Sequence, residues 1–110
     1  MNRLHLSCAI LIVLTCSDAR ALAPLEESVQ PFLSVYCSAC HGSKVQKADR
    51  RFDQLEFGSV GLADAERFQE IVDQLNLGAM PPEGEPRPTD GEVKRVVSIL
   101  TNAIKVFREE

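Results

Sequence analysis

The stretch Cys37-Ser38-Ala39-Cys40-His41 has the spacing of a covalent attachment site for c-type haem. In such a site two thiols add across the vinyl groups of the porphyrin, and the adjacent imidazole binds the iron. Positions i, i+3 and i+4 share one face of a helix, so the two thiols and the imidazole can point toward one flat ligand. The sequence therefore predicts one haem c, attached through Cys37 and Cys40, with His41 as an iron ligand.

The second iron ligand is suggested by the small number of suitable side chains. The chain contains two histidines and two methionines. His5 and Met1 belong to the N-terminal segment, so removal of that segment leaves His41 and Met80 as the remaining imidazole and thioether. A His/Met pair of axial ligands occurs in haem electron carriers, in which it raises the reduction potential. We therefore expect His41 and Met80 to be the metal ligands.

The N-terminus has the pattern of a secretory signal peptide. Arg3 provides a positive start, and residues 6–14 form an apolar run that is too short to cross a bilayer as a helix. Small residues follow at the spacing of a cleavage site, with Ala21 favoured and Ala23 as the alternative. The sequence thus predicts a signal peptide over residues 1–21 and a mature chain over 22–110, exported to the periplasm or an equivalent compartment.

The cysteines agree with export. Cys8 and Cys16 would leave with the signal peptide, so that Cys37 and Cys40 remain as a pair. In an oxidising compartment such a pair becomes a disulfide unless another group takes it up, and haem is such a group. A lipid anchor on Cys16 is disfavoured, because threonine precedes it where a small residue is usual. An uncleaved membrane anchor is disfavoured by the length of the apolar run.

Composition limits the size of the core and the kinds of partner. Residues 22–110 suffice for one small domain, and the chain has no tryptophan, five phenylalanines and one tyrosine. A core built from protein alone would be thin, so we expect the haem-free chain to be poorly folded. The net charge of −4 argues against general binding of nucleic acids, which needs a basic surface.

The first predicted helix spans residues 31–41 and carries the haem motif at its C-terminal end. Pro31 suits the first turn of a helix, and Gly42 is a natural stop. The apolar face is predicted to comprise Phe32, Val35, Tyr36 and Ala39.

Two further helices are predicted by apolar periodicity. Residues 64–75 begin at Asp64 as a cap and end at Asn76-Leu77-Gly78, and residues 90–108 begin with a capping box of Thr89 and Glu92. The buried positions are predicted to be Phe68, Ile71, Val72 and Leu75 in one helix, and Val93, Val96, Val97, Leu100, Ile104 and Phe107 in the other.

The connecting segments are predicted to be irregular. Residues 42–62 contain glycine breakers, with Phe52, Leu55 and Phe57 as apolar anchors. Residues 78–88 are rich in proline and glycine and include Met80. Prolines stiffen the backbone in extended conformations, so this loop can present the thioether sideways.

Other interpretations of Cys37 and Cys40 are a disulfide, a thioredoxin-like redox pair and half of a zinc site. A structural zinc site needs four protein ligands, and three candidates are present here. A thioredoxin-type motif belongs to a βαβ context, which the helical pattern does not provide. A non-haem thiol or disulfide module remains the less favoured alternative.

The alternative for Met80 is a core methionine that fills a gap. The haem would then be five-coordinate and could bind a small gas or peroxide, as in a sensor or a small haem enzyme. The proline-rich loop downstream of a haem motif favours the ligand interpretation.

A cluster of basic residues follows the motif, namely Lys44, Lys47, Arg50 and Arg51. The simpler interpretation is a solvated loop. The functional interpretation is a basic rim that meets an acidic partner or a haem propionate.

Two stretches of the chain resemble the cytochrome c domains that are abundant in secreted planctomycete proteins. The first comprises Gln30-Pro31-Phe32, Tyr36-Cys37 and Cys40-His41-Gly42, and the second is the run Asp73-Gln74-Leu75-Asn76-Leu77-Gly78-Ala79-Met80-Pro81-Pro82. The similarity extends through the C-terminal helix. The resemblance implies a small helical cytochrome c fold, with His41 on one side of the haem and Met80 on the other.

The sequence as a whole predicts an all-α protein, in which three main helices pack around one covalently bound haem. We expect an exported mono-haem c-type cytochrome that carries single electrons between redox partner proteins. We do not expect an enzyme, because both axial positions are filled and no acid–base pair is evident. Nucleic acid and stable membrane insertion after removal of the signal are not expected.

Overall fold

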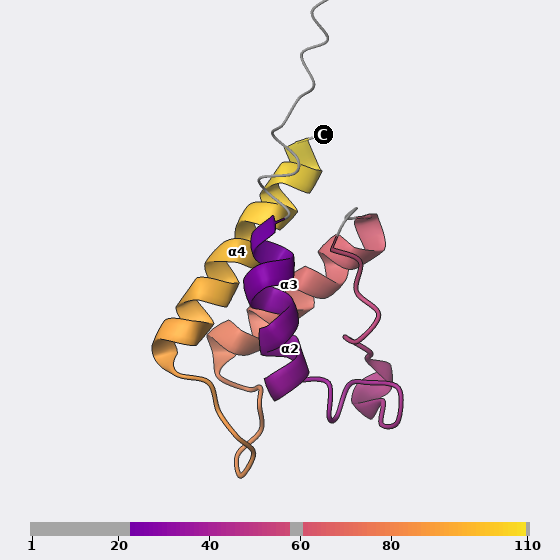
Figure 1. Cartoon of the computed structure of the whole chain (residues 1–110), viewed down its shortest axis with the longest axis vertical. Coiled ribbons are helices and arrows are strands. Elements are labelled where there is room, and N and C mark those ends of the chain that lie inside the picture. The colour runs from indigo at the N-terminus through magenta and orange to yellow at the C-terminus, as the bar shows by residue number, and fades with distance from the viewer. Residues whose placement is uncertain (1–22, 58–60, 110) are drawn as a thin grey trace, which may run out of the picture.

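The computed structural model describes residues 23–57 and 61–109 and shows an all-α architecture. Its three main helices are α2 (Gln30–Tyr36), α3 (Leu62–Leu77) and α4 (Asp90–Glu109) (Figure 1). Within the described ranges no strand forms, apart from one isolated bridge between His41 and Gln46. The predicted all-α class with three main helices is confirmed. The predicted signal peptide and its favoured cleavage site at Ala21 lie within residues 1–22, which are outside the described part, whereas Ala23, the alternative cleavage site, is the first described residue.

The first helix begins earlier than predicted. A π-helical turn, η1 (Leu25–Val29), leads directly into α2, and Pro31 lies in the first turn of α2 as expected. The extra turn extends the buried face toward the N-terminus, so that Leu25, Val29, Phe32 and Leu33 line it. The prediction was wrong for Val35, which is 66% exposed, and for Ala39, which is exposed. Tyr36 is half-buried.

The first helix also ends earlier than predicted, at Tyr36 instead of residue 41. The N–H groups of Cys37 and Ser38 both donate to the carbonyl of Leu33, at 2.9 Å each. Because the second of these bonds spans five residues instead of four, the regular ladder of the helix stops here. The haem motif therefore occupies a turn after the helix and not the helix itself. Within this turn the N–H groups of Cys40 and His41 donate to the carbonyl of Cys37, at 3.2 and 3.0 Å.

Helix α3 begins and ends with well-defined caps. The helix begins at Leu62, so Asp64 is its third residue, and the prediction of Asp64 as the N-cap was wrong. From this position its Oδ2 accepts a hydrogen bond from the N–H of Gly61, the N-cap, at 3.2 Å. At the other end Gly78 adopts a left-handed conformation with φ of 67°. The N–H of Gly78 donates to Leu75 and that of Ala79 to Gln74, both at 3.1 Å. This is the Schellman motif, and it confirms the predicted end at Gly78.

Helix α4 begins with the predicted capping box. The N–H of Thr89 donates to Oε2 of Glu92 at 2.7 Å, and the N–H of Glu92 donates to Oγ1 of Thr89 at 3.1 Å. The box satisfies two backbone donors that the first turn of a helix would otherwise leave free.

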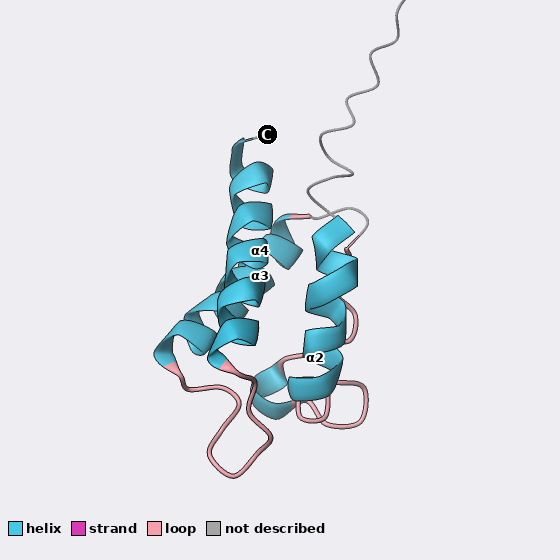
Figure 2. Cartoon of the chain, turned by 60° about the vertical axis from the view of Figure 1, so that its left-hand side comes forward, coloured by secondary structure: helices cyan, strands magenta, loops and turns pink. Residues whose placement is uncertain are grey.

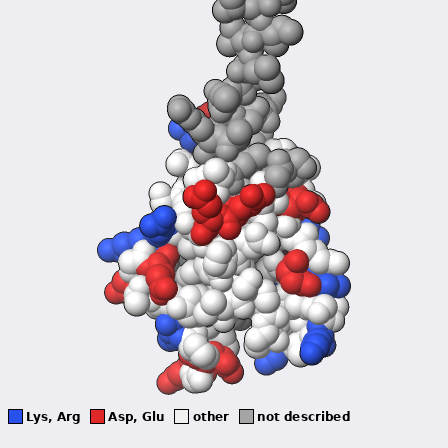
Figure 3. Space-filling view, viewed as in Figure 1, with Lys and Arg blue, Asp and Glu red and all other residues white. Residues whose placement is uncertain are grey.

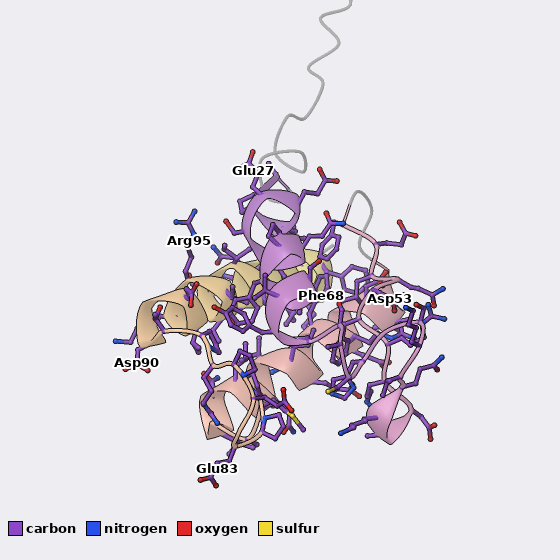
Figure 4. All side chains as sticks on the ribbon, turned by 60° about the horizontal axis from the view of Figure 1, so that its bottom comes forward. Glu27, Asp53, Phe68, Glu83, Asp90 and Arg95 are labelled. Carbon is purple, nitrogen blue, oxygen red and sulfur yellow. The ribbon has the colours of Figure 1, made fainter. Side chains whose placement is uncertain are left out.

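The core lies between α3, α4 and the first helix. Helices α3 and α4 pack along each other, and α4 meets the first helix mainly through η1, while α2 stands beside this pair (Figure 2). Phe68 is fully buried near the centre of the molecule (Figure 4). The predicted apolar positions of α3 are all buried, and Leu55 and Phe57 anchor the irregular segment as expected. In the described part of the chain no helix is both long enough and apolar enough to cross a membrane.

Candidate functional site

The two cysteines of the motif turn are unbonded thiols. Cys37 and Cys40 are each half-buried and form no disulfide. Cys37 packs against the apolar core, and burial raises the pKa of its thiol to about 11.

His41 closes the turn with an unsatisfied ring nitrogen. Its Nδ1 is buried and has no hydrogen-bond partner among the described residues. The ring lies 5.1 Å from the ring of Phe52, measured between centroids, and the N–H of Phe52 donates to the carbonyl of His41 at 2.8 Å. Phe52, predicted as an anchor of the irregular segment, therefore holds the histidine from both its backbone and its side chain.

The segment after the motif folds back over it. The N–H of Lys47 donates to the carbonyl of Cys40 at 2.9 Å, and the N–H of Gly42 donates to that of Val45 at 2.8 Å. A Cβ atom on Gly42 would lie 2.3 Å from the carbonyl oxygen of Ser38, closer than real Cβ contacts allow. Position 42 thus requires glycine because of a close backbone approach.

Met80 lies on the loop between α3 and α4, directly after the Schellman motif. Its side chain is 40% exposed, whereas the following Pro81 is buried. The Nη2 atom of Arg87 donates to the carbonyl of Gly78 at 3.0 Å and so closes the loop across its base. The exposure of Met80 and its non-helical backbone match the predicted loop and disfavour the interpretation as a gap-filling core residue.

The predicted site residues come from two segments that lie at the same end of the molecule. The end of α2 that leads into the motif and the loop 78–89 are both at the bottom of Figures 1 and 2. Tyr36, next to Cys37, donates its hydroxyl to Glu92, with Oη at 3.2 Å from Oε2 and 3.4 Å from Oε1. In the described part of the chain, no three His, Cys, Asp or Glu side chains gather as a metal-binding group.

The bond between Tyr36 and Glu92 perturbs both groups. Partial desolvation and the Glu92 carboxylate raise the pKa of Tyr36. The hydrogen bond from the backbone of Thr89 is the main cause that lowers the pKa of Glu92, and the Tyr36 hydroxyl adds to it. Sequence reasoning assigned Tyr36 to an apolar face and Glu92 to a cap, and missed their contact. The one feature of the sequence that singled out Tyr36 was its position directly before the motif.

The basic cluster is partly neutralised within the chain. Nε of Arg50 lies 2.8 Å from Oε2 of Glu70, and Nη2 of Arg51 lies 2.7 Å from Oδ2 of Asp53, whose pKa this pairing lowers. Figure 4 shows Asp53 on the outer segment that follows the motif. Lys44 and Lys47 are exposed. The ion pairs of the two arginines and the exposure of the two lysines favour the interpretation of this cluster as a solvated loop. On the face seen in Figure 3, both acidic and basic side chains surround an uncharged centre.

A known protein family matches the part of the chain that contains the predicted site residues. Residues 37–84 match the family described as Planctomycete cytochrome C. The matched range begins at Cys37 and extends beyond Met80, so it includes both predicted motifs. No curated protein and no solved structure matches the chain.

Proposed function

Because residues 37–84 identify a planctomycete-type cytochrome c domain, we propose that this chain is an exported c-type cytochrome that carries single electrons. The observation that supports this most is the presence of Cys37, Cys40, His41 and Met80 within the one matched range. The family match confirms the resemblance inferred from the sequence over residues 37–84, whereas the similarity expected for residues 30–36 and for the C-terminal helix lies outside the matched range. We propose in addition that the domain binds haem c, that His41 and Met80 are its iron ligands, and that it transfers electrons.

The donor atoms in the chain fit a covalently held haem. Cys37 and Cys40 are unbonded thiols three positions apart, as thioether formation to two vinyl groups requires. His41 has an unpartnered ring nitrogen, and Met80 projects an accessible thioether from a loop whose two ends are fixed. Imidazole and thioether are ligands that suit haem iron.

Each residue has a defined role in this proposal. Cys37 and Cys40 would attach the group, and His41 and Met80 would bind its iron. The iron, when bound, supplies a centre that alternates between the ferric and ferrous states. If both side chains bound the iron, no position would remain open for a substrate, and this favours a carrier over an enzyme.

The test is an absorbance spectrum of the oxidised and reduced protein, made in an exporting host with c-type maturation. Mass spectrometry would report covalent haem, and Met80→Ala would serve as the ligand control. We expect the weak near-infrared band of ferric His/Met iron in the wild type and its loss in the variant. Covalent haem without that band would indicate an open or differently ligated iron, as in a sensor or small enzyme. Absence of haem would leave a thiol or disulfide module.

Export and redox partners complete the proposal. The signal pattern of residues 1–21 supports export. Export also agrees with the proposed cofactor, because haem attachment takes place outside the cytoplasm in bacteria. N-terminal sequencing of the exported protein would test cleavage after Ala21 or Ala23. The partners would be an electron donor and an electron acceptor that reach the haem edge of this domain.

A further inference from the structure

The connection between the two ligand-bearing segments is made by few side chains. Helix α4 meets the first helix mainly through η1, at the end distant from the motif. Two side-chain hydrogen bonds join these helices within the described residues. Nη2 of Arg95 lies 3.3 Å from Oγ of Ser28 near the start of the first helix, and Tyr36 bonds to Glu92 at its end.

Glu92 serves two segments at once. Its carboxylate accepts a hydrogen bond from the N–H of Thr89, which ends the loop that carries Met80, and another from Tyr36, which precedes Cys37. The other end of the loop is held by Arg87 on the carbonyl of Gly78. The C-terminal end of the loop is therefore tied, through one carboxylate, to the residue that leads into the motif.

We propose that Tyr36 is a positioning residue, which acts through Glu92 to hold the Met80 loop in place against the haem-attachment turn. This inference rests on the proposed function and extends it. The ring of Tyr36 packs against that of Phe32, with the two centroids 5.0 Å apart. This contact fixes the ring, so its hydroxyl is held in the direction of Glu92. Loss of the hydroxyl should loosen the loop and weaken the bond between Met80 and the iron, without removing any ligand.

The experiment measures how readily added imidazole displaces Met80 from the ferric protein. The near-infrared band reports the Met80 ligand, and its loss on titration gives the Kd of imidazole. Tyr36→Phe removes one oxygen and keeps the ring. We expect this variant to bind imidazole about two- to fivefold more tightly than the wild type, the factor that one exposed hydrogen bond of modest strength confers.

Ser28→Ala is the matched control. It also removes one hydroxyl oxygen that links the first helix to α4, but at the end distant from the motif. We expect its Kd for imidazole to equal that of the wild type. An equal shift in both variants would overturn the proposal, since any contact between the helices would then have the same effect. A wild-type Kd in Tyr36→Phe would overturn it as well.

Glu92→Gln tests whether Tyr36 acts through this carboxylate. The amide oxygen can still accept hydrogen bonds but is a weaker acceptor than a carboxylate, so the Kd should lie between those of the wild type and Tyr36→Phe. Adding Glu92→Gln to Tyr36→Phe should cause a smaller shift than Glu92→Gln causes alone, because only its bond to the N–H of Thr89 then remains to be weakened, and an equal shift in both backgrounds would contradict the coupling. If the wild type itself lacks the near-infrared band, the proposed function fails and this inference with it.

Discussion

At the scale of single residues, position 42 requires glycine because two backbone segments approach each other closely there. The turn that bears the motif folds so tightly that a Cβ atom at position 42 would collide with the carbonyl of Ser38. The sequence suggested this glycine as the end of a helix. The structure assigns it a different reason, because the helix has already ended at Tyr36.

Gly42→Ala should therefore destabilise the protein. We expect the free energy of unfolding to fall by about 1–3 kcal/mol, since the backbone carbonyl cannot move aside without breaking the turn. Urea denaturation of the haem-loaded protein measures this. Gly91→Ala in the first turns of α4 is the control, because its Cβ would meet nothing nearer than Oγ1 of Thr89 at 3.9 Å. That variant should be unchanged or slightly more stable, and equal losses in both would refute the explanation.

Glu92 gives a second prediction at this scale, in the dependence of stability on pH. Its pKa is lowered in the folded protein, so its ionised form stabilises the fold at neutral pH, and this contribution is lost as the pH falls below the ordinary titration range of glutamate. Wild type and Glu92→Gln should therefore differ in urea midpoint at pH 7 and converge in acid. A difference that stays constant down to pH 3 would contradict this, because glutamine does not titrate.

At the scale of elements, the ends of the helices determine where the proposed site residues lie. The Schellman motif ends α3 directly before Met80, and the capping box starts α4 directly after the loop. Both ends were visible in the sequence, because capping depends on neighbouring residues only. The end of α2 was not visible, because the shared acceptor at Leu33 leaves no pattern in the sequence.

Thr89→Ala should lower the stability of the protein by about 1 kcal/mol, the usual effect of removing an N-cap side chain. The N–H of Glu92 would lose its partner on Oγ1. Thermal unfolding of the haem-loaded protein would measure the change. Thr101→Ala, at an exposed position later in the same helix, should have a much smaller effect. If the two variants behaved alike, the cap would not be the cause.

At the scale of the whole molecule, the question is how far the protein core suffices without haem. Among the described residues, the buried set is formed largely by Leu, Val and Ile, with three buried phenylalanines and no fully buried tyrosine. A small domain of this kind has little stability in reserve. A bound porphyrin would add a large apolar surface against which the helices pack.

The double substitution Cys37→Ser/Cys40→Ser would prevent the proposed covalent attachment of haem and so tests this dependence. We expect less helical circular dichroism than in the haem-loaded protein, and a broad instead of a cooperative urea transition. Circular dichroism at matched concentration measures both. Native-like helicity with cooperative unfolding in the haem-free variant would show that the protein core is sufficient by itself.

The sequence alone determined the features that depend on local chemistry. These are the motif from Cys37 to His41, the buried positions of α3, the cap of α4 and the end of α3 at Gly78, all of which follow from spacings of a few residues. The tertiary structure decided what depends on contacts between distant residues. The first helix buries Leu33 and leaves Val35 exposed, and Tyr36 meets Glu92, which lies 56 positions further along the chain. Periodicity predicts that a helix has an apolar face, but packing against other helices fixes which residues that face contains and where the helix ends.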